Sequence, residues 1–206
     1  MKKVILCGAI ALFGFLSANA QEVKFGVKAG VNLATIGGDV EDADGRTSFH
    51  VGGVAEIMIS DKFSVQPELL YSAQGLQSEY SETIMGSELK FEEKLKLDYI
   101  NLPIMAKFYV AEGLSIEAGP QVGFLISAES EVEASYQGES ENETDDVKDA
   151  FKSIDFAAGI GLGYKLDSGL NFSARYTLGL ANIAEDAGDD SSIQNNVLQV
   201  SLGYMF

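Results

Sequence analysis

The feature that most constrains this chain is a two-residue alternation of apolar with polar or small side chains, repeated in stretches of roughly ten residues. Over residues 197–206, leucine, valine, tyrosine and phenylalanine occupy every second position, and mainly glutamine, serine and glycine stand between them. Residues 154–165 repeat the pattern with three glycines, which would destabilise a helix interior. The alternation therefore predicts β-strands with two chemically different faces.

Eight such stretches predict an all-β fold, an eight-stranded antiparallel up-and-down transmembrane β-barrel. A soluble β-sandwich would show similar strands, and a soluble lipocalin-like barrel would turn its apolar face inward. The second face is too charged for a soluble core, which favours the membrane barrel. The predicted strands lie near residues 24–34, 49–59, 63–74, 96–110, 114–127, 153–166, 170–182 and 195–206.

The connections between the predicted strands alternate between short and long. Residues 60–62, 111–113 and 167–169 are predicted tight turns, whereas the other four connections are much longer. Short turns at one end and long loops at the other are typical of outer-membrane barrels. With an even number of strands, we expect the short turns and both termini on the periplasmic side and the long loops on the extracellular side.

The N-terminal residues predict a cleavable signal peptide. Two lysines precede an apolar run at residues 4–16, and an Ala-Asn-Ala sequence follows. We expect residues 1–20 to be removed and residues 21–206 to form the outer-membrane barrel domain. The single cysteine, Cys7, leaves with the signal, so disulfides are not expected in the mature chain. Beyond it, no apolar run approaches the ~18 residues of a membrane helix, so a span there has to be made of strands.

Aromatic residues of the apolar face gather near the ends of the predicted strands, as they do at the two interfaces of a bilayer. We predict one girdle near the periplasmic side and a second near the extracellular side. The first consists of Phe25, Phe63, Phe108, Tyr164, Phe172 and Tyr204, and the second of Phe49, Tyr71, Tyr99, Phe124 and Phe156.

If the apolar face meets lipid, the opposite face must line the lumen. Eight strands enclose just enough space for side chains, so we expect the lumenal charges to pair with one another and with neighbouring amides. Glycines in the same phase leave room for the longer side chains. The prediction is a side-chain-filled polar lumen instead of a wide diffusion pore. Its charged members are Lys24, Lys28, Lys107, Lys165, Arg175, Glu56, Glu68, Glu117 and Asp155.

Acidic residues dominate the charge of the chain. The sequence has 31 acidic and 14 basic residues, and the excess of acids falls almost entirely in the four long loops. This charge argues against binding to nucleic acid. Three roles for the loops stay open. They are solvated caps that keep barrels apart, sites for divalent cations that bridge to lipopolysaccharide phosphates, or a surface for a cationic partner such as another envelope protein.

The sequence offers one histidine for catalysis, His50, with Ser48 two residues before it and therefore on the same strand face. A catalytic pair of this kind needs an orienting acid and an oxyanion site, which the sequence does not place. The fragment at 42–45 resembles a calcium loop, but valines stand at the first and twelfth positions of the corresponding EF-hand pattern. We assign no catalytic, cofactor-binding or metal-binding residue and no cofactor, and we expect no enzymatic activity.

Four segments resemble the PorT-like outer-membrane β-barrel family of Bacteroidetes: residues 21–32 (QEVKFGVKAGVN), 66–71 (QPELLY), 99–104 (YINLPI) and 119–121 (GPQ). The resemblance spans nearly the whole mature chain and implies the barrel fold and the outer membrane. The family's namesake is tied to a secretion system, but many members share only the barrel. The resemblance therefore carries no activity to this chain.

The C-terminal residues 202–206 (LGYMF) resemble the aromatic last strand that the barrel-assembly machinery recognises. We therefore expect this machinery as a partner during insertion, and outer-membrane lipid and lipopolysaccharide as partners afterwards. The three prolines, Pro67, Pro103 and Pro120, fall inside predicted strands. We expect them to mark β-bulges, where a ladder hydrogen bond is already missing.

Three functional hypotheses follow. The first is a non-enzymatic barrel with a structural or surface-interaction role, which depends on the acidic loops. The second is an accessory component of a PorT-like secretion system. The third is a small channel. Fold alone does not decide among them.

Overall fold

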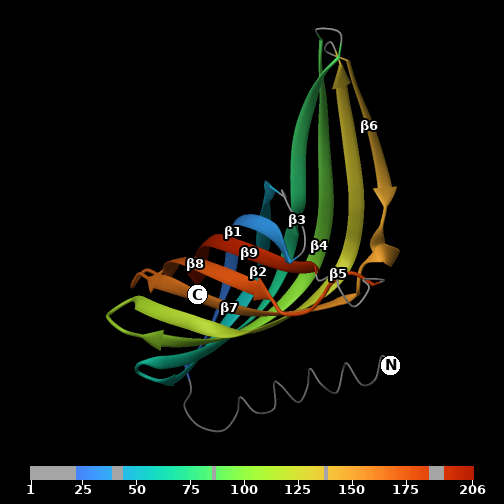
Figure 1. Cartoon of the computed structure of the whole chain (residues 1–206). Helices are drawn as coiled ribbons and strands as arrows, with labels where there is room; N and C mark the ends of the chain where they lie inside the picture. Colours follow the sequence, from blue (N-terminus) through green and yellow to red (C-terminus); the bar gives the residue numbers. More distant parts are fainter. Residues whose placement is uncertain (1–21, 39–43, 85–86, 137–138, 186–192) are drawn as a thin grey trace.

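The computed structural model describes residues 22–38, 44–84, 87–136, 139–185 and 193–206. The predicted signal peptide, residues 1–20, lies outside this part of the chain. Nine strands account for most of the described residues (Figure 1). No helix among these residues is long and apolar enough to cross a membrane. The strands are β1 (Val23–Gly38), β2 (Asp44–Ser60), β3 (Phe63–Ile84), β4 (Ser87–Tyr109), β5 (Leu114–Tyr136), β6 (Glu139–Asp146), β7 (Ile154–Lys165), β8 (Leu170–Gly179) and β9 (Ile193–Met205), with a short 3-10 helix η2 (Lys148–Ala150) after β6.

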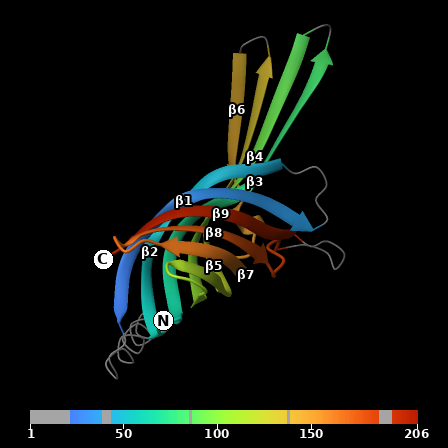
Figure 2. The ribbon, with the colours of Figure 1, turned by 90° about the vertical axis from the view of Figure 1, so that its left-hand side faces the viewer.

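Eight of these strands close into one antiparallel ring, which confirms the predicted barrel. The order around the ring is β4, β3, β2, β1, β9, β8, β7 and β5, and β5 pairs again with β4. The first and last strands meet, because β1 pairs with β9 from Gly26 opposite Met205 to Gly38 opposite Ile193. Figure 2 shows these strands curving around a common centre. Closure gives every strand of the ring a hydrogen-bonded partner on both sides.

The three predicted tight turns are confirmed, and all lie at the same end of the ring. Ser60 pairs with Phe63 across the turn between β2 and β3. Between β4 and β5, Gly113 has a φ of 73°, and between β7 and β8, Gly169 has a φ of 90°. Both glycines occupy the left-handed region, where side chains with a Cβ are strained. Glycine therefore allows these turns to reverse the chain within a few residues.

Two of the predicted long loops are wrong, because much of residues 75–95 and 128–152 forms strands. β3 and β4 stay paired as far as Ile84 and Ser87, β5 follows β4 to its end, and β6 pairs with β5. Together they form a four-stranded sheet that continues beyond the ring (Figure 1). Charges suggested loops here, but a sheet with water on both faces also accepts charged side chains. We call this the protruding sheet and define it as residues 76–84, 87–96, 129–136 and 139–146.

The ring turns apolar side chains outward and charged side chains inward, as predicted. Ile160 on β7 is 61% exposed, whereas Arg175 on the neighbouring strand β8 is 1% exposed. In a soluble protein the burial would be reversed. Most of the predicted girdle aromatics are exposed on the outside: Phe25, Phe108, Tyr164, Phe172 and Tyr204 toward the short turns, and Phe49, Phe124 and Phe156 toward the other end.

One predicted girdle residue lies in the lumen, and one predicted lumenal lysine lies at the mouth of the lumen. Tyr99 is not part of a girdle, because it stands two residues from the lumenal Asn101, shares its phase and is 1% exposed. Lys24 keeps the lumenal phase but lies at the short-turn mouth of the lumen, where it lines the same cavity as Tyr109 and Lys165. It lies near the start of β1, where its ammonium pairs with Glu22 at 3.1 Å and 38% of the side chain is exposed.

The prediction that the prolines mark bulges is also wrong. The β3–β4 register is the same on both sides of Pro67, and the β4–β5 register is the same on both sides of Pro103. Pro120 pairs with Ala158 in an unshifted β5–β7 ladder. A proline lacks one donor but does not require an inserted residue, so pairing resumes in the same register. The β4–β5 ladder shifts instead at Ile126 of β5, which has no partner between the pairs of Leu125 and Ser127.

Adjacent glycines on β2 test how closely the ring is packed. A Cβ added at Gly52 would overlap the carbonyl oxygen of Leu69 on β3, whereas a Cβ added at Gly53 would find its nearest neighbour, the oxygen of Gly26, at 3.9 Å. We expect Gly52→Ala to lower the free energy of unfolding by about 2 kcal/mol or more. Gly53→Ala should change it by less than about 0.5 kcal/mol. Urea titration of the barrel refolded in lipid vesicles measures both, and equal destabilisation would contradict the packing.

Candidate functional site

The centre of the lumen is organised around the carboxylate of Glu68 on β3. Arg175 on β8 donates from Nη1 to Oε2 at 2.9 Å and from Nη2 to Oε1 at 2.7 Å, which is a bidentate pair. Lys28 on β1 reaches the same carboxylate at 3.3 Å. The guanidinium also donates from Nε to Glu117 on β5 at 2.7 Å. Strands from opposite sides of the ring are therefore joined through one buried ion cluster.

A second carboxylate, Glu56 on β2, extends this cluster toward the short turns. Lys165 donates to it at 2.8 Å, Lys107 lies 3.6 Å away, and the hydroxyl of Tyr109 also donates to it. Gln66 connects the two carboxylates, because its amide nitrogen donates to Glu68 at 2.7 Å and its oxygen accepts from Lys107 at 3.0 Å. The cavity beside this network measures only about 10 Å³, no more than one water molecule requires. The side chains therefore fill this part of the lumen, as predicted.

Asp155 lines the lumen, as predicted, but stays outside the network. It is buried on β7, and its Oδ1 accepts no hydrogen bond from a described residue. Gly123 on β5 stands between Asp155 on β7 and Asn101 on β4 in the sheet, and its lack of a side chain leaves these two residues as neighbours. The predicted pairing of the lumenal charges therefore holds for Lys28, Lys107, Lys165, Arg175 and the three glutamates, but not for Asp155.

His50 belongs to a second, uncharged network of the lumen. Its Nδ1 lies 2.7 Å from Oδ1 of Asn32, and its Nε2 lies 2.9 Å from the hydroxyl of Ser201. The sequence suggested Ser48 as its neighbour, but that hydroxyl donates to the carbonyl of Ala73 at 2.6 Å. Ser201 comes from β9, 151 residues away, and only ring closure brings it to β2.

A serine, a histidine and an orienting amide in this order resemble a nucleophilic constellation. Catalysis also needs room for a substrate, and His50 is 1% exposed, Asn32 is fully buried and Ser201 is 5% exposed. A Cβ added at Gly30 would lie 2.7 Å from Cε1 of His50, so the imidazole is closely packed. The nitrogen of Asn32 is also engaged, donating to Ser72 at 3.0 Å. The arrangement supports cross-strand hydrogen bonding, which orients β1, β2, β3 and β9.

Apolar side chains cover the lumen at the end opposite the short turns. Leu97, Tyr99, Leu125, Ala128 and Ile183 form a buried cluster, with Phe151, Val147 and Ile193 packed against it. The segment after β6 crosses this end, where the backbone nitrogen of Lys152 donates to the carbonyl of Ile183 at 2.8 Å. This cluster therefore separates the polar lumen from the base of the protruding sheet.

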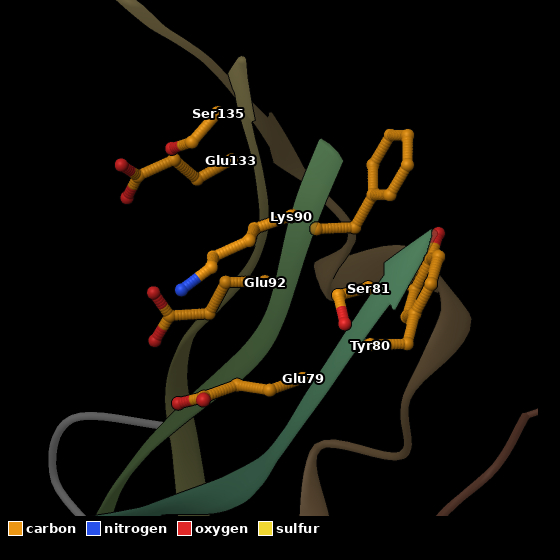
Figure 3. Close-up of a pocket in the computed structure, with 8 residues that line it drawn as sticks. Glu79, Tyr80, Ser81, Lys90, Glu92, Glu133 and Ser135 are labelled. Carbon is orange, nitrogen blue, oxygen red and sulfur yellow. The ribbon is translucent and has the colours of Figure 1, made fainter. Parts of the chain in front are cut away.

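The protruding sheet has one face that is rich in both signs of charge, and we call it the outer face. On it, Glu79, Glu92 and Glu133 stand directly opposite one another across β3, β4 and β5 (Figure 3). Six of its residues line a shallow cavity of about 340 Å³, together with Tyr80 and Phe91 from the other face of the sheet. Among the described residues, no three His, Cys, Asp or Glu side chains are placed to hold a metal ion. The other members are Gln77, Ser81, Lys90, Lys94, Lys96, Glu129, Glu131, Ser135 and, on β6, Ser140, Asn142, Thr144 and Asp146.

Lysines compensate much of the negative charge on the outer face. Lys94 pairs with Glu92 at 2.6 Å, and this hydrogen bond raises the pKa of the lysine. Lys96 donates to Glu131 and lowers the pKa of that carboxyl. The amide of Gln77 donates to both Glu79, at 2.9 Å, and Glu92, at 2.7 Å. The outer face is therefore stabilised largely by its own side chains.

A match to a family model supports the architecture. The family model described as "Outer membrane protein beta-barrel domain" matches residues 19–185. Among solved structures, the attachment invasion locus protein Ail of Yersinia pestis is similar, with 14% identity, a TM-score of 0.49 and coverage of 90% of this chain and 99% of that chain. Neisserial surface protein A has 11% identity, a TM-score of 0.45 and the same coverage. The N-terminal β-barrel domain of Pseudomonas aeruginosa OprF has 10% identity and a TM-score of 0.41, and covers 91% and 100%. Among curated proteins, none matches the chain.

The Glu68 cluster makes the ring sensitive to loss of Arg175. Arg175→Met removes the cation shared by Glu68 and Glu117, which leaves the buried Glu117 without its ion pair and Glu68 with Lys28 alone. We expect the free energy of unfolding to fall by about 3–5 kcal/mol. Lys24→Met, which removes an exposed ion pair, should cost less than about 1 kcal/mol. Urea titration in vesicles separates the two, and an equally small loss in both variants would contradict a stabilising role for the cluster.

Proposed function

Because the chain belongs to the outer membrane protein beta-barrel domain family, we propose that it is a non-enzymatic barrel that presents the protruding sheet at the cell surface for contact with other molecules. The observation that carries this proposal is the sheet itself. Three ring strands, β3, β4 and β5, continue beyond the ring for up to nine paired rows, and β6 pairs with the extension of β5. The ring is closed without these additional rows. Such an extension adds a large solvent-exposed surface to the barrel and contributes nothing to its closure.

The filled lumen argues against a channel. Buried ion pairs cross its centre, and an apolar cluster covers one end. Conduction would require both to rearrange, and separating the buried charges is costly. The burial of His50 and Ser201 argues likewise against catalysis, because a substrate would have to enter the closed ring. With conduction and catalysis both disfavoured, contact with other molecules at the cell surface is the role that remains.

For the orientation, we propose that the short turns and both termini face the periplasm and that the protruding sheet faces the outside. Short periplasmic turns and long extracellular segments are the usual arrangement in such barrels. The exposed apolar side chains of the ring would contact outer-membrane lipid and lipopolysaccharide. The aromatic C-terminal strand would engage the barrel-assembly machinery during insertion. The resemblance to PorT-like proteins and the secretion role stay predictions of the sequence, and the geometry adds no support for export.

Single-cysteine variants test both the orientation of the barrel in the membrane and the contact of the protruding sheet with other molecules. Ser81 lies on the protruding sheet and Asp167 lies in a short turn. A membrane-impermeant photo-crosslinker that reacts with thiols should label Ser81→Cys on intact cells, and should label Asp167→Cys only after the outer membrane is permeabilised. Illumination should then link Ser81→Cys to another surface or extracellular protein. Labelling of Asp167→Cys on intact cells would contradict the orientation, and illumination without any cross-linked species would contradict the contact role.

A further inference from the structure

The second face of the protruding sheet continues the lumenal side of the barrel. The β3–β4 register is unbroken from the ring into the sheet, so Ser78 and Tyr80 keep the phase of lumenal residues such as Ser72. The shift at Ile126 resets β5, which brings Val132 and Ala134 to the same side. We call this side the inner face. It consists of Leu76, Leu95, Ser130 and Asp145 in one row, Ser78, Glu93, Val132 and Glu143 in the next, and Tyr80, Phe91, Ala134 and Glu141 in the third.

Apolar and aromatic side chains occupy the centre of the inner face. Tyr80 and Phe91 stack with ring centroids 5.0 Å apart and an interplanar angle of 17°. In Figure 3, the ring of Tyr80 lies on the side of the sheet away from Lys90, Glu92 and Glu133. Tyr80 is 48% exposed, and Val132 in the neighbouring row is also exposed. Water-exposed aromatic and aliphatic groups in adjacent rows gain free energy when an apolar partner covers them.

Carboxylates border this apolar strip, and the described residues of the inner face include no cation. Glu141, Glu143 and Asp145 follow one another at every second position of β6, with a spacing of roughly 6.8 Å. Glu93 on β4 adds a fourth carboxylate and accepts a long hydrogen bond of 3.4 Å from Tyr80. Within the described part of the chain, the three β6 carboxylates form no ion pair. The outer face, by contrast, holds three lysines of its own.

We propose that the inner face binds a cationic polypeptide segment with an apolar side, supplied by another protein. Lysine or arginine side chains of the segment would pair with the β6 carboxylates, and its apolar side chains would cover Tyr80 and Phe91. Charge complementarity selects this occupant. Lipopolysaccharide phosphates, nucleic acids and the same face of a second copy are all anionic, so the inner face repels them. The inference rests on the proposed surface role and names the class of partner.

A labelled synthetic helix of lysine and leucine, about 18 residues long with one apolar side, is the probe. The full-length barrel is placed in nanodiscs of zwitterionic phosphatidylcholine, and empty nanodiscs measure binding of the probe to lipid. One triple variant removes inner-face charge, with Glu141→Gln, Glu143→Gln and Asp145→Asn. The matched control removes the same charge from the outer face, with Glu79→Gln, Glu129→Gln and Glu133→Gln. Heat-modifiable electrophoretic mobility shows that each variant retains the folded ring.

We expect the inner-face triple variant to weaken binding of the probe about tenfold, and the outer-face control to weaken it less than about twofold. Tyr80→Ser, which keeps all charges, should weaken it about threefold or more. A probe with glutamate in place of lysine should not bind. Equal weakening by both triple variants, or wild-type binding no stronger than that to empty nanodiscs, would overturn the proposal. These measurements use purified protein and do not depend on the labelling of cells. If the sheet binds the probe in nanodiscs but is not labelled on intact cells, the proposed surface role is refuted and the binding property of the inner face is not.

Discussion

Closure of the sheet is the constraint on which the rest of this structure depends. Pairing of β1 with β9 and of β4 with β5 gives each strand of the ring two partners, so the strand alternation sorts all side chains into an inside and an outside. Eight strands leave an interior about as wide as the side chains that point into it. Glu68, Arg175 and Glu117 can therefore meet across the lumen, although they come from three different strands. The ion cluster is both a product of closure and a bond that holds the opposite walls together.

The same alternation runs beyond the ring, but the chemistry of its two faces exchanges there. On β4, the outward positions change from Ile104 and Ile100 in the ring to Lys96 and Lys94 in the protruding sheet. The inward positions change in the opposite sense, from Asn101 through Leu97 to Phe91. A strand that leaves an apolar surrounding for water no longer needs an apolar outer surface. The exchange near Asp98 therefore marks the boundary of the lipid-facing belt, and it gives the sheet an inner face that differs from both the lumen and the outer face.

Sequence reasoning predicted the ring, its tight turns and most lumenal charges. The alternation of side chains and the charge on one face of each strand can be read along the chain, and both remain unchanged when the sheet closes. It could not predict which side chains meet across the lumen. His50 pairs with Ser201 instead of Ser48, since register and closure, not proximity in the chain, decide the contact. The protruding sheet was also missed, because alternating charged residues such as those of residues 139–146 fit a loop and a water-exposed strand equally well. Tyr99 was assigned to a girdle against the phase of its own strand, because the correctly predicted Lys107 and Phe108 already place odd-numbered residues toward the lumen.

Depth in the bilayer is the most direct test of where the two faces exchange. The chain contains no tryptophan, so each introduced tryptophan is the only one present. Ile104→Trp places the reporter on the outside of the ring, and Phe91→Trp places it on the inner face of the protruding sheet. In bilayers with brominated acyl chains, fluorescence of Ile104→Trp should be strongly quenched and that of Phe91→Trp should be unchanged. Equal quenching of both, or none at Ile104→Trp, would contradict a lipid-facing ring with a sheet that stands in water.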